Sequence, residues 1–322
     1  MKKFTKLLCM ICVLMLVLAG CGKGANEETS ASDEQNQLKE INISYVTAPL
    51  NVPSIVEKHE NLFEEEFKDI KINFPEITQG SKMTEAVATG DLDFCNALGG
   101  TSAIIGKANG VDIKIIGTYS RAPKCFTIMT NDENIQSVKD LKGKKVAGPK
   151  GTILHQLLIA AGNEAGVSID DMEFIQMGIG NGVSSMMSKN VDAALVAGPA
   201  VIKAQEGGAR ILRNGEGLLD ATIVIGARGE FVKEHPDLVE KYMNVHEKAL
   251  KFMEENQEKM FEMVAEENGV SVEDVKTMYP WYDFNPTITE KDVKELEKTQ
   301  DFLLDNGMIQ EKIDIKTLFV EE

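Results

Sequence analysis

Residues 137–166 read "SVKDLKGKKVAGPKGTILHQLLIAAGNEAG" and decide the fold of this chain. A short apolar strand at 145–147 runs into a glycine-rich turn at 148–152, and a helical run then continues to Gly162 or Gly166. The backbone N–H groups at a helix start have no partner within the helix, so such a start can hold a small anionic or polar group. The order strand, turn, helix therefore predicts an α/β unit with a candidate binding turn at its centre.

The same order of elements repeats on both sides of this stretch. Strands alternate with helices of about ten residues or more, which predicts right-handed strand–helix–strand units and a largely parallel sheet. The predicted upstream elements are strands at 41–47, 70–77, 92–98 and 112–120 and helices at 51–67, 81–91 and 102–110. The predicted downstream elements are strands at 172–178 and 192–198 and helices at 181–190 and 199–208. The two blocks predict two α/β lobes.

From His235 onward the sequence turns strongly helical. Between 235 and 269 apolar residues recur at helical spacing with charged residues opposite, which predicts an amphipathic helix. Ser271 and Thr289 are each followed by an acid three residues later, a capping pattern that predicts helices at 271–278 and 289–307. We expect these helices to pack back on the first lobe. The predicted lobes are thus 41–127 plus 222–322, and 128–221.

The N-terminal segment carries export signals. Residues 1–20 read as a signal peptide, because lysines precede an apolar run that is too short for a membrane span. The run ends in Leu18-Ala19-Gly20-Cys21, which resembles the bacterial lipobox and predicts lipidation of Cys21; an ordinary signal peptide with a coincidental cysteine is the alternative. Residues 21–40 are polar and lack periodicity, which predicts a flexible tether. We expect a lipid-anchored protein on the outer face of the cell membrane.

Composition narrows the classes of partner. The formal net charge is −17, and removal of residues 1–20 with their three lysines would bring it near −20. Such a charge disfavours nucleic acid and anionic membrane surfaces, although a single site can still be locally positive. Of five cysteines, only Cys95 and Cys125 fall in the predicted fold, as two buried thiols or as a disulfide. No cysteine–histidine cluster has zinc-site spacing, and we predict neither a metal nor a cofactor.

The sequence offers little for catalysis. It contains no G-x-S-x-G elbow, H-E-x-x-H motif or phosphate-binding lysine loop. "MGIGNG" at 177–182 lacks the third glycine and the acidic partner of a dinucleotide site. His59 and His246 lie among charged helix residues and are expected to be solvated, while only His155 lies near a ligand-capable turn. We therefore predict a binding protein rather than an enzyme.

Five predicted turns share one position, after the C-terminal end of a strand and before a helix start. Ligands of α/β sheets bind at this edge. The candidate ligand-binding residues in these turns are Pro49, Leu50, Asn51, Gly80, Ser81, Gly99, Gly100, Thr101, Lys150, Gly151, Thr152, Gly198 and Pro199. Glycine, serine and threonine are also common caps and turn residues, so a purely structural role is the alternative for each turn. Five turns in matching places favour a shared cleft.

Four further residues are candidates beside Lys150, which is either a point charge for an anion or a solvated lysine. His155, one turn after Thr152, can donate to a ligand oxygen or pack in the core. Arg121 follows a strand and is either a ligand-binding or a surface residue. Trp281 and Tyr282 lie in an irregular, proline-flanked segment, where an aromatic ring can stack on a planar ligand or pack between lobes.

Together these features resemble a known family. The quoted stretch, "TQGSKMTEAVATGDLDFCNALGGTSAI" at 78–104 and "MMSKNVDAALVAGPA" at 186–200 resemble the nitrate/sulfonate/taurine family of ABC-transporter substrate-binding proteins, from about residue 41 to residue 305. The resemblance implies a type II periplasmic-binding fold, with two lobes of mainly parallel sheet joined by two crossover strands as a hinge. It also implies a small-molecule ligand that is held between the lobes and delivered to a membrane permease driven by an ATPase. We expect a monomer.

The ligand itself is left open by the resemblance. A small organic anion, sulfonate-like or similar, is the first prediction. The chain departs from sulfonate binders of the family by its single tryptophan and by a lysine in the 148–152 turn. Pyrimidine- and flavin-type relatives share the architecture, so a neutral or aromatic ring solute is the alternative, and an enzyme like the thiamine-pyrimidine synthases is a third.

Overall fold

The computed structural model describes residues 38–320 of the chain. The predicted signal peptide, the predicted lipidation site at Cys21 and most of the predicted tether lie outside these residues. Within 38–320, none of the helices combines the length and the apolar character needed to span a membrane.

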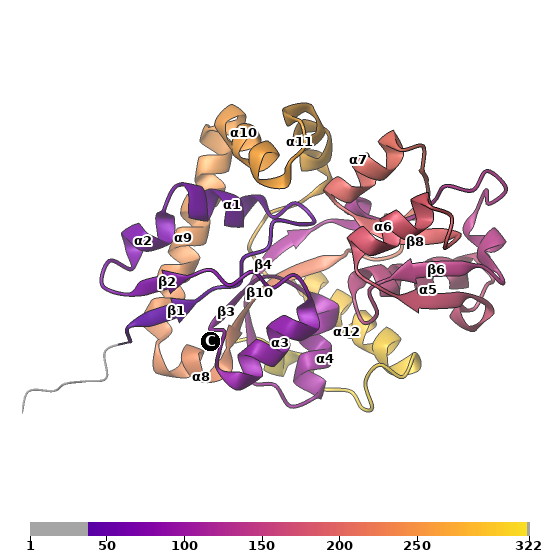
Figure 1. Ribbon diagram of the computed structural model, residues 1–322. Helices are drawn as coiled ribbons and strands as arrows, with labels where there is room; N and C mark the ends of the chain where they lie inside the picture. The colour runs from indigo at the N-terminus through magenta and orange to yellow at the C-terminus, as the bar shows by residue number, and fades with distance from the viewer. Residues whose placement is uncertain (1–37, 321–322) are drawn as a thin grey trace, which may run out of the picture. The chain divides into compact units, whose positions relative to one another are not determined.

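The first sheet is built from both ends of the described chain. Strands β1 (Glu40–Asn42) and β2 (Lys71–Asn73) pair in parallel, and a parallel bridge between Ile43 and Phe94 leads to β3 (Phe94–Gly99). Strand β10 (Thr222–Arg228) lies between β3 and β4 (Ile113–Arg121) and is antiparallel to both. In Figure 1 the strands of this sheet run from indigo for β1 and β2 through purple for β3 and β4 to salmon for β10.

The second sheet has five strands in the order β7-β6-β8-β5-β9. Their bounds are Glu173–Gln176 for β7, Lys145–Gly148 for β6, Ala193–Ala197 for β8, Phe126–Thr130 for β5 and Arg210–Asn214 for β9. Strand β6 is parallel to β7 and β8, whereas β5 is antiparallel to β8 and β9.

Each sheet contains one strand that is antiparallel to the rest, β10 in the first and β5 in the second. In both cases it is the first strand after the chain passes over from the other sheet. Strand β5 follows β4 through the short turn at Pro123–Cys125, and β10 follows β9. The remaining strands of each sheet share one direction, so the predicted mainly parallel sheets are confirmed apart from these two crossover strands. Parallel strands place their C-terminal ends at one edge, and it is there that the turns with the candidate residues lie.

Helices cover the sheets as the sequence patterns indicate. The helices that follow strands of the first sheet are α1 (Val52–His59), α2 (Leu62–Glu66), α3 (Gly80–Thr89), α4 (Gly100–Ala108) and α8 (Gly229–Glu234). Those of the second sheet are α5 (Ile153–Ala165), α6 (Ile179–Met187) and α7 (Pro199–Glu206), and the C-terminal ones are α9 (Pro236–Glu255), α10 (Gln257–Asn268), α11 (Val272–Met278) and α12 (Glu290–Asp305). The predicted caps Ser271 and Thr289 both form full capping boxes, with Asp274 and Asp292.

Two predicted helices are broken in the structure. The predicted 51–67 helix splits at Asn61, which adopts a left-handed conformation, and the predicted 235–269 helix splits at Asn256. Helices α9 and α10 contact α1 of the first sheet, while α12 packs on α4 and β10, so the C-terminal helices do return to the first sheet (Figure 1). The residue boundaries of the two lobes stay a prediction.

Candidate functional site

Three contacts, one of them unusually close, bring turns of the two sheets together. A Cβ atom placed on Gly198, between β8 and α7, would lie 1.7 Å from the carbonyl oxygen of Pro49, in the loop before α1. A Cβ on Gly99 would lie 3.5 Å from Ile153 Cδ1 at the start of α5, and a Cβ on Gly151 would lie 3.6 Å from Ile105 Cδ1. The turns predicted to form one cleft therefore face each other.

The remaining predicted turn, at 79–81, lies beside the 99–101 turn on the first sheet. A Cβ on Gly80, at the start of α3, would lie 2.2 Å from the hydroxyl of Ser102 in the first turn of α4. Ser81 is exposed, whereas Gly100 and Thr101 are buried. The starts of α3 and α4 thus lie side by side at this edge of the first sheet.

Two buried hydroxyls in this region have no hydrogen-bond partner among residues 38–320. They belong to Thr101, at the start of α4, and to Thr222, at the start of β10. Both line one small pocket with Ile153 and Gln156 of α5. A buried hydroxyl without a partner is unfavourable by about 1–3 kcal/mol, so a water that bonds to these oxygens would be stabilised in this pocket of about 10 Å³.

The side chain of His155 holds the predicted binding turn in place through a hydrogen bond to its backbone. Its Nδ1 accepts a hydrogen bond of 3.3 Å from the backbone N–H of Gly151, and its ring packs on Phe174. Burial, together with the nearby charge of Lys150, lowers the pKa of His155 to about 4. His155 is therefore neutral near pH 7, and with Nδ1 as the acceptor its proton resides on Nε2. Lys150 itself is exposed and forms no ion pair with any described residue.

The lowered pKa of His155 predicts a loss of stability in mild acid. Between about pH 6.5 and pH 4 the unfolded chain binds a proton at this histidine that the folded chain rejects, so stability falls as pH falls through this window. We expect His155→Gln, which can still accept the Gly151 N–H, to remove about 2–3 kcal/mol of this loss between pH 7 and pH 4.5. Urea unfolding at both pH values measures the difference, and equal losses in variant and wild type would contradict it.

Several predicted site residues have other roles in the structure. Leu50 is fully buried in the core, and the Asn51 side chain donates to the backbone oxygens of Val46 and Ala48, so both residues hold the loop before α1. Pro199 is buried as the first residue of α7. These positions favour the structural alternative stated for each turn.

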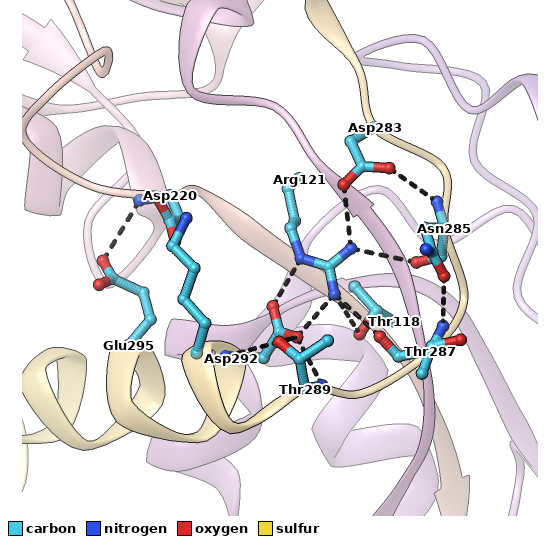
Figure 2. Close-up of polar contacts among 10 residues, drawn as sticks. Thr118, Arg121, Asp220, Asp283, Asn285, Thr287, Thr289, Asp292 and Glu295 are labelled. Carbon is cyan, nitrogen blue, oxygen red and sulfur yellow. Dashed lines mark hydrogen bonds and ion pairs between the residues drawn. The ribbon is translucent and has the colours of Figure 1, made fainter.

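Arg121 and the aromatic pair also have structural partners. The Arg121 guanidinium binds the carboxylates of Asp292 and Asp283 and the backbone oxygens of Asn285 and Thr287 (Figure 2). Its donors are thus committed within the protein, which favours a structural role over ligand binding.

Tyr282 stacks on Phe284 with ring centroids 5.5 Å apart, and burial raises its pKa well above the usual value. Trp281, beside it, is half-buried. This packing favours a role for the pair in joining segments of the fold.

The structure adds two features that the sequence did not single out. Thr222 begins a strand, and no glycine or proline turn marks it as a site residue. The turn at 178–181 follows β7, and the N–H of Met177 donates to the oxygen of Gly148, which places this turn beside the predicted 148–152 turn. Its sequence signal was present, since it too is a glycine-rich turn between a strand and a helix.

The described cysteines and acids add no metal or redox chemistry to the site. Cys95 and Cys125 are buried free thiols, which decides between the two alternatives for this pair. Burial raises the pKa of both thiols, so neither is a reactive thiolate. No group of three or more histidine, cysteine or acidic residues within 38–320 is arranged to hold a metal ion.

Comparison with known proteins adds the family context. The family model described as "NMT1/THI5 like" matches residues 49–260. A protein of Bacillus subtilis (strain 168) named for the binding of aliphatic sulfonates is 31% identical over 96% of this chain and 92% of its own length. A protein of Escherichia coli (strain K12) with the same name is 24% identical over 94% of this chain and 95% of its own length.

The fold is shared with solved binding proteins. The alkanesulfonate-binding protein SsuA from Xanthomonas axonopodis pv. citri superposes with a TM-score of 0.81 at 22% identity, over 88% of this chain and 98% of that one. At this identity the likeness shows the fold, and it confirms the predicted two-lobed periplasmic-binding architecture.

Proposed function

The chain belongs to the NMT1/THI5-like family, and on that premise we propose that it is the extracytoplasmic solute-binding component of an ABC importer that captures a small organic anion, sulfonate-like or similar, between its two lobes. The observation that carries the proposal is the pair of unpartnered hydroxyls of Thr101 and Thr222 at the meeting edges of the two sheets. The names of the relatives support the solute class, because both are named for aliphatic sulfonates.

The chemistry of the cleft suits an anion. In this proposal the N–H groups at the starts of α4 and α5 donate to the oxygens of the ligand, and the two threonine hydroxyls complete its hydrogen bonds. Lys150, exposed beside the start of α5, supplies positive charge, whereas the neutral His155 supplies none. Closure of the lobes removes water from the bound group and strengthens each of these interactions.

The remaining parts of the proposal concern how the protein works in the cell. The ligand is bound and released unchanged, and the protein hands it to a membrane permease with its ATPase. Cys21 carries the lipid anchor, the protein is a monomer, and the lobes divide at the predicted boundaries near 127 and 222. Support for binding rather than catalysis comes from the relatives, which are named as binding proteins.

A thermal-stability screen of the full chain in detergent tests the solute class. The panel contains alkanesulfonates, taurine, nitrate, bicarbonate, pyrimidines, flavins and aromatic acids, and unfolding is followed by intrinsic fluorescence. A ligand at a hundred times its dissociation constant adds about 2.7 kcal/mol to stability, which is a clear shift of the midpoint. A response to alkanesulfonates or taurine is expected, and a response to ring compounds alone would contradict the anion proposal in favour of the aromatic alternative.

Substitution of the donors then locates the bound group. We expect Thr101→Val to weaken binding of the anion found in the screen by about tenfold to a hundredfold, because one hydrogen bond to a charged group is lost. Thr277→Val, at an exposed position of α11, is the matched control and should leave affinity unchanged. Calorimetric titration measures both, and equal affinity in the two variants would remove Thr101 from the site.

A further inference from the structure

One turn of α12 holds the strand that leaves the first sheet. The Nε and Nη2 atoms of Arg121, the last residue of β4, each lie 2.6 Å from an oxygen of Asp292, in a two-pronged pair (Figure 2). The Asp292 side chain is only 2% exposed, and its carboxylate also accepts hydrogen bonds from the N–H and the hydroxyl of Thr289. Burial by itself would raise the pKa of Asp292, but these hydrogen bonds outweigh it and hold the pKa below its usual value.

The same turn holds the strand that returns. Lys291 Nζ lies 2.8 Å from an oxygen of Asp220, and the backbone N–H of Asp220 donates to Glu295 over 3.2 Å. Asp220 lies two residues before the start of β10, whose first residue, Thr222, pairs with Arg121 in the sheet. The start of α12 therefore binds both the end of β4 and the residue that leads into β10 (Figure 2).

Further along, α12 reaches a helix of the second sheet. The Nε2 atom of Gln156, in α5, donates to the hydroxyl of Thr299, in α12, over 3.2 Å. Both side chains are buried, and both line the pocket that contains the unpartnered hydroxyls of Thr101 and Thr222. Gln156 follows His155 directly, so this bond joins α12 to the helix whose start forms the candidate binding turn.

We propose that the Gln156–Thr299 hydrogen bond is a latch for the closed lobes and that the Arg121–Asp292 pair positions α12 to form it. Gln156 belongs to α5, which covers the second sheet, and Thr299 belongs to α12, which packs on the first. Separation of the lobes would therefore break this bond. The same helix, α12, also holds the ends of β4 and β10, the strands next to the two crossovers. This contact keeps Thr299 in position to meet Gln156 when the lobes close. The proposal rests on the proposed function only in taking closure as the step that traps the ligand.

If the Gln156–Thr299 bond is a latch, its loss should change the ratio of closed to open chains even without ligand. One hydrogen bond of this kind changes an equilibrium by about twofold to tenfold. We expect Thr299→Val and Gln156→Leu each to lower the ratio of closed to open chains by this factor. The double variant should show no greater effect than either single one, because both remove the same bond. Thr299→Ser keeps the hydroxyl and should keep the wild-type ratio.

Single-molecule energy transfer on the full chain in detergent measures this ratio. Dyes are attached through non-natural residues at Glu64 in α2 and Glu206 in α7, which are exposed and lie outside the site. Thr277→Val serves as the control for a threonine-to-valine change in a helix. An unchanged ratio in Thr299→Val, or effects that multiply in the double variant, would overturn the latch.

The positioning role of Arg121 and Asp292 has its own arm of the experiment. In an Asp292→Asn background, Thr299→Val should have lost most of its effect on the ratio, because the helix is no longer held in register. A full effect of Thr299→Val in that background would overturn this part. If Asp292→Asn does not fold, Arg121→Lys replaces it, since lysine cannot form the two-pronged pair.

A titration with ethanesulfonate completes the test. The ratio without ligand reports the latch, whereas the response to ethanesulfonate reports the proposed solute class. A chain in which the variants shift the ratio but ethanesulfonate does not would keep the latch and contradict the sulfonate proposal. The opposite outcome is also possible: wild type and Thr299→Val have equal ratios of closed to open chains before ligand is added, and both close to the same extent on ethanesulfonate. That result would contradict the latch and keep the sulfonate proposal.

Discussion

Gly198→Ala should abolish tight binding of the anion without unfolding the protein. Gly198 has a φ of 60°, and a Cβ there would lie 1.7 Å from the Pro49 carbonyl oxygen. A backbone oxygen cannot rotate away as a side-chain end can, so the turn before α7 and the loop before α1 must separate. These segments serve different sheets, and their separation amounts to opening of the cleft. We expect affinity to fall at least about a hundredfold, which corresponds to roughly 3 kcal/mol.

Calorimetric titration together with small-angle scattering measures this effect and its cause. Scattering should show that Gly198→Ala stays expanded when the ligand is added, whereas the wild type contracts. Gly166→Ala is the matched control: Gly166 ends α5, has a similar positive φ of 73° and has open space around it. Affinity of Gly198→Ala within about threefold of the wild type, a difference under 1 kcal/mol, would contradict the predicted clash.

Glu57→Leu should destabilise the first sheet more than any exposed charge change. Glu57 in α1 and His246 in α9 are 1% and 0% exposed, and Glu57 Oε1 lies 2.8 Å from His246 Nδ1. The other oxygen of Glu57 accepts a hydrogen bond from Asn96. Removal of one partner leaves a buried polar group without compensation, which costs about 3–5 kcal/mol. His246→Leu should cost a similar amount.

Urea unfolding of the single and double variants tests this pair. The double variant Glu57→Leu/His246→Leu should cost clearly less than the sum of the single ones, because neither member of the pair is left buried without the other and Asn96 keeps its hydrogen bond to Ser54. The control is Glu85→Leu, at an exposed pair with Lys82 in α3, and its effect should stay within about 1 kcal/mol. Additive losses in the double variant would show that the two side chains do not act as a pair.

The structure overturns one prediction about this pair. The charged neighbours of His246 in the sequence predict that it is solvated, but it is fully buried. In a helix, neighbours in the sequence point to different faces, and His246 lies on the same stripe as Tyr242, Ala249 and Met253. Helical spacing rather than local composition was the informative signal.

Local features of the sequence determined the elements and their order. Capping boxes at Ser271 and Thr289, the helix ends at Gly90 and Gly166, and the alternation of strands and helices all act within a few residues of the chain. For that reason they can be read without the fold. The same reasoning placed the glycine-rich turns at one edge, because parallel strands end together.

Only the tertiary structure decided which polar groups find partners. Arg121 meets Asp292 across 171 positions of the chain, and Glu57 meets His246 across 189. The same packing left the Thr101 and Thr222 hydroxyls buried without a partner among the described residues. No pattern within one element carries this information, because burial and pairing depend on which distant surfaces meet. The sequence alone thus determined where the glycine-rich turns gather, and long-range packing decided which polar side chains at that edge have no partner among the described residues.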